Sequence, residues 1–252
     1  MSSAPVPVTV VIAARNERAE IAACVASVTW ADEVLVVEND STDDTVEQAR
    51  QAGATVFSHP FTTIGAQRNA AITRARHDWI LVVDADERAT PEVAAAVVAA
   101  IGTGGARAFR VRRRNVFLGR EIRHGGWEKD RPVRLFRREL RYDERPVHEH
   151  VIVEGEVGLL PAPFIHEPYA TLGEYFEKLQ RYSGWWATQQ HARGRRARVT
   201  DLVVRPPLRF LTMWVIRQGW RDGVHGVVLA VLGAVSVAAK YAQLWALDRR
   251  SR

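Results

Sequence analysis

The sequence of 252 residues has a single cysteine, Cys24. One thiol excludes an internal disulfide, and it fits a reducing compartment. Cys24 lies in an alanine-rich segment whose apolar residues recur with helical spacing. We therefore interpret it as a small buried hydrophobic residue and not as a nucleophile. The composition, with 47% apolar and 25% charged residues, is that of a globular chain.

A secretory signal and a membrane-spanning apolar run are also missing. Residues 1–7 contain no basic signal region, and the apolar run at 8–14 belongs to a pattern that continues as a fold. The apolar stretch Gly226–Ala239 has 14 residues. A helix needs roughly twenty to span a bilayer. We therefore expect a cytoplasmic protein without a simple membrane span.

The chain has fewer acidic residues than basic ones, with 29 Asp and Glu against 35 Lys and Arg. The net charge is +6 and the pI is about 10.0, and arginine supplies most of the positive charge. This balance points to anionic partners such as nucleic acid, phosphorylated ligands or an anionic membrane surface. The basic clusters at 112–114 and 193–198 raise the alternative of a non-catalytic nucleic-acid-binding protein. No nucleic-acid-binding motif accompanies them, so we predict no nucleic-acid partner.

Strands alternate with helices over about the first hundred residues. Ser41 or Thr42 is expected to cap the second helix, and Thr90-Pro91 is typical of a helix start. The alternation predicts an α/β fold with a Rossmann-like, mostly parallel sheet and flanking helices. The strands are expected at 6–14, 33–37, 55–57 and 79–83, and the helices at 19–28, 44–52, 65–76 and from 90 onward.

Polar clusters follow three of these strands, at 15–17, 38–40 and 84–86. Ligands of parallel sheets lie beyond the carboxyl ends of the strands, so we expect the clusters to meet in one cleft. Asp84 and Asp86 are two residues apart, which places both carboxylates on one side of an extended chain. Such oxygens suit Mg²⁺ or Mn²⁺. The alternative is an ordinary acidic turn that caps the next helix.

Four motifs carry a resemblance to a known family: VVIAARNE (10–17), VVENDSTDDT (36–45), GAQRN (65–69) and VVDADE (82–87). In this order and spacing they resemble the family-two glycosyltransferases of the GT-A fold. The segments 125–127, 131–137 and 145–149 resemble the subgroup of lipopolysaccharide-core β-glucosyltransferases and similar bacterial envelope sugar transferases.

The resemblance implies an inverting transfer from a nucleoside-diphosphate sugar, a UDP-hexose, to a cell-envelope glycan or glycolipid. Glu17 and Glu38 would hold the base and ribose, and Arg68 would approach the diphosphate. A polyprenyl-phosphate acceptor is the alternative within the enzyme class. The implied nucleotide-sugar positions are Ala14, Asn16, Glu17, Glu38, Asp40, Arg68, Asp84 and Ala85. Where the family commonly has Asp-Asp-Gly, this chain has Glu38-Asn39-Asp40.

The resemblance also implies a metal site and a base. Mg²⁺ or Mn²⁺ would offset charge on the departing nucleoside diphosphate, held by Asp84, Asp86 and His148. An inverting displacement needs a base for the acceptor hydroxyl, and we assign Glu149, with Asp130 second. His148 is alternatively an orienting or a structural histidine. His166 is a further metal or phosphate candidate, or a packed loop histidine.

Three residues are candidates for the acceptor. Trp127, beside two glycines, is expected to stack on a sugar ring, with a core aromatic as the alternative. Arg131 and Arg134 are expected to contact an acceptor phosphate, with solvent-facing strand residues as the alternative.

We predict a catalytic domain at 1–200, with a nucleotide-sugar half at 1–104 and an acceptor-side half at 105–200. The tail at 201–252 is basic, with tryptophans flanking apolar residues. This combination is typical of helices that lie in a membrane interface. We therefore predict a peripheral hold on the inner face of the cytoplasmic membrane. The alternative is a helical hairpin that packs on the catalytic domain or joins two copies of the chain as a homodimer.

Overall fold

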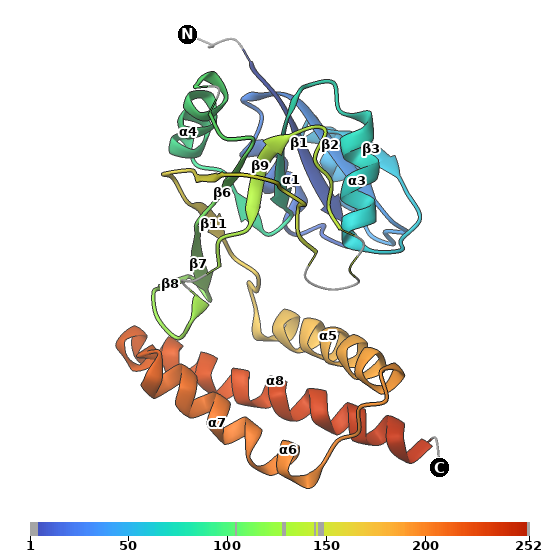
Figure 1. Ribbon diagram of the computed structural model, residues 1–252, viewed down its shortest axis with the longest axis vertical. Coiled ribbons are helices and arrows are strands. Elements are labelled where there is room, and N and C mark those ends of the chain that lie inside the picture. Colours follow the sequence, from blue (N-terminus) through green and yellow to red (C-terminus); the bar gives the residue numbers. More distant parts are fainter. Residues whose placement is uncertain (1–4, 104, 128–129, 144, 146–148, 251–252) are drawn as a thin grey trace. The chain divides into compact units, whose positions relative to one another are not determined.

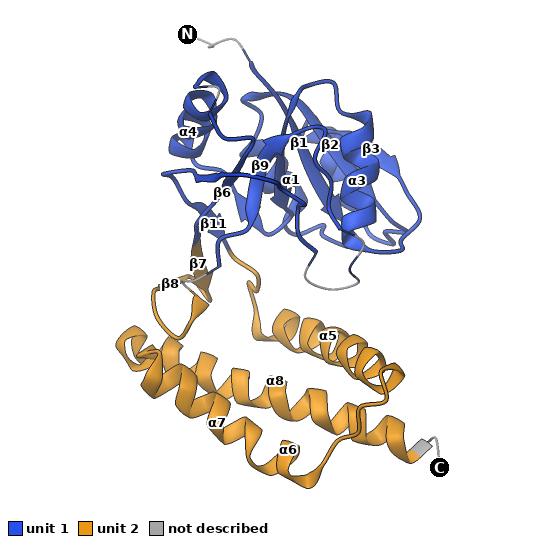
Figure 2. Cartoon of the chain, in the orientation of Figure 1, with its two compact units in different colours: residues 1–113, 130–166 blue, residues 114–129, 167–252 orange. Residues whose placement is uncertain are grey.

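The computed structural model describes residues 5–103, 105–127, 130–143, 145 and 149–250 (Figure 1). The chain forms two compact units (Figure 2). Unit 1 contains residues 1–113 and 130–166, and unit 2 contains residues 114–129 and 167–252. Unit 2 thus includes residues before 201, the position where the predicted tail begins.

Unit 1 is built on a seven-stranded sheet with the order β10-β6-β9-β4-β1-β2-β3. The strands β3, β2, β1 and β4 are parallel, β9 runs antiparallel to β4 and β6, and β10 is parallel to β6. The α/β prediction of a mostly parallel sheet with flanking helices is confirmed. The strands are β1 (Val6–Ala14), β2 (Ala31–Glu38), β3 (Thr55–Ser58), β4 (Trp79–Asp84), β6 (Ala108–Arg110), β9 (Val133–Arg137) and β10 (Val157–Leu159).

Helices cover both faces of this sheet, which explains why the central strands are apolar throughout. One face, with Val10 and Ile12, packs against α1 (Ile21–Ala26), α2 (Thr45–Gln51) and α4 (Pro91–Gly102). The other face, with Val11, packs against α3 (Ile64–Arg74).

The predicted cap of α2 is wrong. The N-cap is Asp44, and the backbone N–H of Thr45 donates to Asp43 Oδ1 at 3.1 Å. Neither Ser41 nor Thr42 fills this role, because the helix begins further along the chain.

A short pairing connects the end of β4 with a distant segment. Strand β5 (Glu87–Arg88) follows the acidic cluster and pairs antiparallel with β11 (Phe164–His166). In this register His166 lies opposite Glu87.

Unit 2 contains a hairpin and a group of helices. Strands β7 (Arg113–Phe117) and β8 (Arg120–Ile122) form the hairpin, although the first residue of β7 belongs to unit 1. The unit's core joins the hairpin to the helices through Phe117, Tyr175, Met213 and Leu229. The helices are α5 (Leu172–Ala192), α6 (Val199–Val203), α7 (Arg205–Leu211), a π-helical turn (Thr212–Ile216), a 3-10 turn (Gly219–Asp222) and α8 (Gly223–Arg250).

Helix α8 is longer than the apolar stretch that indicated it, with 28 residues. The helical segment Gly219–Arg249 has 31 residues and a mean hydropathy of 1.8, and 28% of its most apolar window is buried. By length and composition it is sufficient to cross a membrane. The expectation of a tail too short to span is therefore wrong, because polar residues such as Lys240 do not end the helix.

Candidate active site

Asp84 ends strand β4, and three arginines surround its carboxylate. Arg68 Nη2 donates to Oδ1 at 2.5 Å, Arg113 Nη2 donates to Oδ2 at 2.7 Å, and Arg134 also donates to Oδ2. Burial alone raises the pKa of Asp84, but the charges of Arg134, Arg68 and Arg113 outweigh it and hold this pKa well below its usual range. Asp84 is therefore ionised, and both of its carboxylate oxygens accept hydrogen bonds from arginines.

Glu87 is completely buried below this cluster, with 0% exposure. Its Oε1 accepts from Arg113 Nε at 2.6 Å and from Arg134 Nη2 at 3.1 Å. Its Oε2 accepts from the backbone N–H of Asp84 at 2.8 Å, which fixes the turn after β4. Glu87 thus holds Arg113, Arg134 and the turn after β4 in place.

Arg68 is a buried residue of α3, with 7% exposure. Arg68 therefore does not lie on a solvated face of this helix. Its Nη1 donates to Glu149, and its guanidinium lies 5.0 Å from the ring centre of Tyr142. One guanidinium thus joins the end of β4 to the predicted base.

The GAQRN motif explains how Glu149 reaches this place. A Cβ on Gly65 would lie 2.6 Å from the carbonyl oxygen of Asp143, so only glycine permits this approach. Asn69 exchanges two hydrogen bonds with the backbone of Tyr142, at 2.9 and 3.0 Å. These contacts hold the segment that precedes Glu149 against α3.

Asp86 faces a different partner from Asp84. His166 Nε2 lies 3.7 Å from Asp86 Oδ1, because β11 pairs with β5. Burial lowers the pKa of His166, although the charge of Asp86 acts in the opposite direction. A neutral imidazole beside a carboxylate is a donor set that suits a divalent metal.

The residues that were predicted to bind a metal lie in different surroundings. Among the described residues, no group of three or more His, Cys, Asp or Glu side chains forms a ready metal cluster. Both oxygens of Asp84 accept hydrogen bonds from arginines, whereas Asp86 lies beside His166. His148 lies outside the described residues. A metal therefore fits here as an ion that nucleotide phosphates and water help to coordinate.

The loops after β1 and β2 are tied together. Asn16 Oδ1 accepts from the backbone N–H of Thr42 at 2.8 Å, and the backbone N–H of Glu17 donates to Thr45 Oγ1 at 2.8 Å. Ala14 is the buried last residue of β1. Side chains of one loop thus pair with the backbone of the other just beyond the ends of β1 and β2.

The structure shows how Glu38-Asn39-Asp40, which stands where the family commonly has Asp-Asp-Gly, fits the loop after β2. Asp40 has a φ of 48°, a left-handed conformation that favours glycine and that aspartate tolerates. Glu38 is buried, accepts from the backbone N–H of Ser41 at 3.1 Å and hydrogen-bonds Ser58. The longer carboxylate is thus used to fix the loop. The Nδ2 of Asn39 is buried and has no hydrogen-bond partner among the described residues.

The remaining predicted residues lie in different settings. Asp130 is 55% exposed and paired with Arg113, and Arg131 is exposed. Arg134 is buried, so the solvent-facing alternative is wrong for it. Ala85 is buried between the two aspartates and its carbonyl accepts from Arg88 at 2.7 Å.

Trp127 belongs to unit 2, where its ring packs edge-on against Phe117 at 6.1 Å between ring centres. Asn115 Nδ2 donates to the carbonyl oxygen of Trp127 at 2.7 Å.

Sequence reasoning missed Arg113. Its segment alternates between polar and apolar residues, which is typical of half-exposed strands, so nothing local marks it as buried. The signal in the sequence was the place of Arg113 in the basic cluster 112–114.

A comparison with protein families shows which family the chain belongs to. The sequence model of "Glycosyl transferase family 2" matches residues 9–158, which include the strand ends, Arg68, Asp84, Asp86 and Glu149. The chain belongs to glycosyltransferase family 2. It is therefore an enzyme, and we set aside the alternative of a non-catalytic nucleic-acid-binding protein.

Two relatives cover nearly the whole chain. This family 2 glycosyltransferase is 31% identical to the lipopolysaccharide core biosynthesis glycosyltransferase LpsC of Rhizobium meliloti, over 97% of this chain and 95% of that protein. It is 26% identical to the uncharacterized glycosyltransferase RT0209 of Rickettsia typhi, over 96% of this chain and 87% of that one.

Among solved structures, glucosyl-3-phosphoglycerate synthase of Mycobacterium tuberculosis, with Mn²⁺, UDP and phosphoglyceric acid, matches with 24% identity and a TM-score of 0.36. That match covers 44% of this chain and 43% of the other chain. The chain thus spans less than half the length of this solved structure.

Proposed function

We propose that this enzyme transfers a hexosyl group, with inversion, from UDP-hexose to a lipopolysaccharide-core type glycolipid at the cytoplasmic face of the membrane. The observation that carries the proposal is the link from Asp84 through Arg68 to Glu149 at the end of a parallel sheet. This link joins a carboxylate that can accept a proton to the strand end where we propose that the diphosphate binds. The similarity to LpsC over almost the full chain supports the acceptor class.

The metal is proposed to bind Asp86 and His166, with nucleotide phosphates and water as the other ligands. When bound, Mg²⁺ or Mn²⁺ offsets the negative charge that develops on the leaving diphosphate. Asp84 is proposed to contribute through its arginines. Arg113 and Arg134 fix its carboxylate, and Arg68 supplies positive charge where the diphosphate approaches.

Glu149 is proposed as the base, with Asp130 as the second candidate. The acceptor hydroxyl attacks the anomeric carbon, its proton passes to the Glu149 carboxylate, and the bond to the diphosphate oxygen breaks with its electron pair. Arg68 orients the Glu149 carboxylate through their ion pair. Asp130 is more exposed and pairs with Arg113.

The nucleoside and acceptor contacts extend the proposal. Asn16, Glu17 and Glu38 border the loops that are proposed to hold the nucleoside. Arg131 is proposed to meet an acceptor phosphate, since its side chain is exposed. The acceptor role of Trp127 remains a proposal from its sequence motif.

The membrane role rests on exposed apolar residues in unit 2. Val224, Val227, Val231 and Val235 are exposed along α8 at helical spacing. An apolar helix face with basic neighbours is typical of a membrane-associated helix. Replacing these four valines with serine is expected to release the protein from vesicles in a sedimentation assay. Unchanged sedimentation of the folded variant would remove this part of the proposal.

The experiment that tests the catalytic proposal measures donor hydrolysis and thermal stabilisation with a panel of nucleotide sugars and Mg²⁺ or Mn²⁺. Asp86→Ala should abolish the metal-dependent signal. Asp78→Ala is the matched control, because Asp78 is an exposed aspartate immediately before the start of β4. If no nucleotide sugar stabilises the protein, or if both variants respond alike, the site assignment is wrong.

Two further arms refine the test. Glu149→Gln should retain donor binding and lose transfer, and retained turnover would remove Glu149 as the base. Polyprenyl phosphate and a lipopolysaccharide-core glycolipid, offered separately as acceptors, distinguish the proposed acceptor from its alternative.

A further inference from the structure

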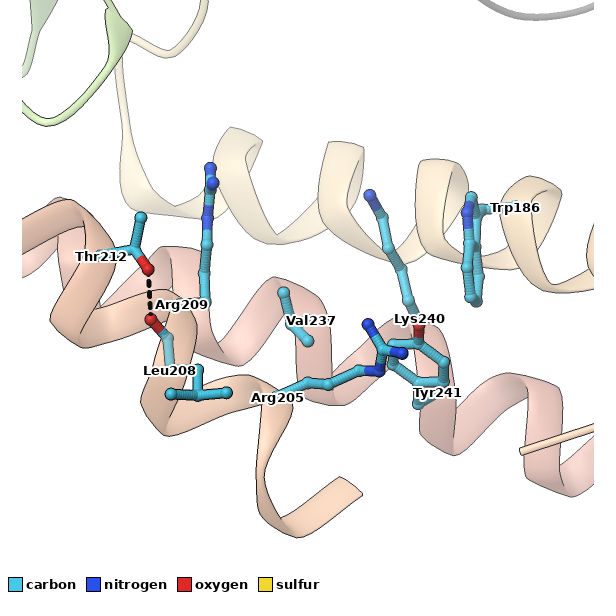
Figure 3. Close-up of a pocket in the computed structure, with 8 residues that line it drawn as sticks. All are labelled: Trp186, Arg205, Leu208, Arg209, Thr212, Val237, Lys240 and Tyr241. Carbon is cyan, nitrogen blue, oxygen red and sulfur yellow. Dashed lines mark hydrogen bonds between the residues drawn. The ribbon is translucent and has the colours of Figure 1, made fainter. Parts of the chain in front are cut away.

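Helices α5, α7 and α8 of unit 2 enclose a groove that lies outside the catalytic residues (Figure 3). Its volume is about 360 Å³, enough for a small polar headgroup. The lining residues are Trp186, Arg205, Leu208, Arg209, Thr212, Val237, Lys240 and Tyr241.

Three cations line this groove, but they are not equivalent. Arg205 Nε donates to Asp201 Oδ1 at 2.5 Å, so its charge is compensated. Within the part of the chain that the structure describes, no ion pair joins Arg209 or Lys240 to a carboxylate. Both side chains are only partly exposed. The groove therefore holds two positive charges without protein counter-ions.

The surroundings make these two charges unfavourable when the groove holds only water. Burial lowers the pKa of Arg209, and the nearby charge of Arg217 acts in the same direction. Burial and the charge of Arg209 lower the pKa of Lys240. A bound anion would relieve the repulsion between these groups and replace the solvent that they lose.

The geometry around the two cations favours phosphate. Figure 3 shows Arg209 and Lys240 both pointing toward α5, the helix that carries Trp186. A guanidinium and an ammonium that line the same groove and point the same way can bind different oxygens of one phosphate. Tyr241 and Trp186 wall the groove with aromatic surface, and their ring centres are 5.1 Å apart.

Apolar surface continues from the groove along α7. Leu208 lines the groove and is 54% exposed, and Leu211 and Val204 on neighbouring positions are also exposed. A soluble phosphate would leave this surface in water, whereas the hydrocarbon of a lipid would cover it. The ligand that fits both features has a phosphate head and an apolar body.

We propose that the groove between α5, α7 and α8 binds the phosphate group of a lipid, with Arg209 and Lys240 as its ligands and the exposed apolar surface of α7 beneath its hydrocarbon part. Two sources share this chemistry: a phospholipid of the bilayer and a phosphorylated glycolipid acceptor. The inference rests on the membrane role in the proposed function, and its binding test requires no nucleotide sugar.

The test compares two double variants of the full chain by vesicle co-sedimentation. Arg209→Gln with Lys240→Gln removes both groove ligands. Arg181→Gln with Arg221→Gln removes the same net charge from exposed arginines of unit 2 that do not line the groove. Neutral vesicles are doped either with phosphatidic acid or with oleate at equal surface charge, so that only one series presents phosphate.

On phosphatidic acid vesicles, the groove variant is expected to bind about tenfold more weakly than the control variant, the loss of roughly 1.4 kcal/mol. On oleate vesicles the two variants should bind alike. The groove variant should melt no lower than wild type, because it loses two repelling cations. Equal binding of both variants to phosphatidic acid would overturn the proposal.

Two additional arms identify the source. A phosphorylated glycolipid in neutral vesicles tests the acceptor, and phosphatidic acid tests the bilayer. Stabilisation by soluble glycerol phosphate equal to that by the lipids would overturn the assignment to a lipid. Metal-dependent donor hydrolysis should be unchanged in the groove variant. Loss of lipid binding with intact donor hydrolysis therefore separates this inference from the catalytic proposal.

Discussion

Asn69 on α3 forms two hydrogen bonds with the backbone of Tyr142: its Oδ1 accepts from the N–H at 2.9 Å, and its Nδ2 donates to the carbonyl oxygen at 3.0 Å. The Asn69 side chain thus forms the two hydrogen bonds that a neighbouring strand would form in a sheet, because it pairs with both the N–H and the carbonyl oxygen of Tyr142. The segment that it holds leads to Glu149, which meets Arg68 one residue before Asn69 in the chain. The family motif therefore positions the proposed base through backbone contacts.

The first prediction concerns this pair. Asn69→Ala leaves two backbone groups of Tyr142 unsatisfied and should lower the free energy of unfolding by about 1–3 kcal/mol. The transfer rate should fall more than donor affinity, since Glu149 loses its support. Thr73→Ala is the control, because Thr73 is an exposed residue one turn later on α3. Urea unfolding and separate donor-binding and transfer assays measure both effects. Equal behaviour of the two variants would contradict the role of Asn69.

Gly65 gives the second prediction. The Cβ of Gly65→Ala would lie 2.6 Å from the carbonyl oxygen of Asp143, so the segment or the helix must shift. Overpacking of this kind costs about 1–3 kcal/mol of stability. Gly102→Ala is the matched control, since nothing lies within 4 Å of its Cβ. There alanine should be neutral or stabilise by up to about 1 kcal/mol. Thermal unfolding of both variants decides, and a stable Gly65→Ala would show that the approach is not tight.

The parallel strands and the polar residues at their carboxyl ends could be predicted from the sequence, and the reason is physical. Parallel strands buried on both faces produce apolar runs, and their carboxyl ends carry the polar residues, so local pattern and ligand site coincide. The end of β4 at Asp84 and the loop ties at Asn16 follow from this rule. The family resemblance added Arg68 and Glu149, which no local pattern connects.

Residues brought in by long-range pairing were harder to predict. Arg134 reaches Asp84 because β9 inserts antiparallel beside β4, and strand order is not written in the spacing of either segment. Arg113, the first residue of β7, reaches the same carboxylate from a different segment. His166 reaches Asp86 only through the two-residue pairing of β5 with β11. The length of α8 was underestimated because only the uncharged stretch 226–239 was counted, whereas the helix continues through Lys240 to Arg250.

Glu87 is the subject of the third prediction. It is fully buried and accepts hydrogen bonds from Arg113 and Arg134, so Glu87→Gln leaves an uncompensated buried positive charge. The expected loss of stability is about 3–5 kcal/mol. Glu139→Gln removes a carboxylate from an exposed pair with Arg107 and should cost no more than about 1 kcal/mol. Urea unfolding compares them. A stable but inactive Glu87→Gln would assign Glu87 to catalysis instead.

Cys24 gives the fourth prediction. The thiol is fully buried, its Sγ donates to the carbonyl oxygen of Asp84 at 3.4 Å, and burial strongly raises its pKa. The thiolate needed for alkylation is therefore scarce in the folded protein. Iodoacetamide should label Cys24 only after unfolding, in parallel with the loss of circular dichroism in urea. Rapid labelling of the native protein, with activity lost at the same rate, would contradict the structural interpretation.

The fifth prediction is a pH dependence at Asp201. Burial alone raises the pKa of this carboxyl, but the hydrogen bonds from the backbone N–H of Arg198 and from Arg205 outweigh it and lower the pKa. A depressed folded-state pKa contributes stability above the unfolded value of about 3.9, and this contribution is lost as the pH falls through the folded value. Asp201→Asn should thus be about 1 kcal/mol less stable than wild type near neutral pH, and the gap should narrow below about pH 4. Arg205→Gln retains the hydrogen bond from Arg198, so it should show a smaller gap. Urea unfolding at several pH values measures each gap, and a gap that stays constant below pH 4 would contradict the assignment of this stability to the Asp201 carboxylate.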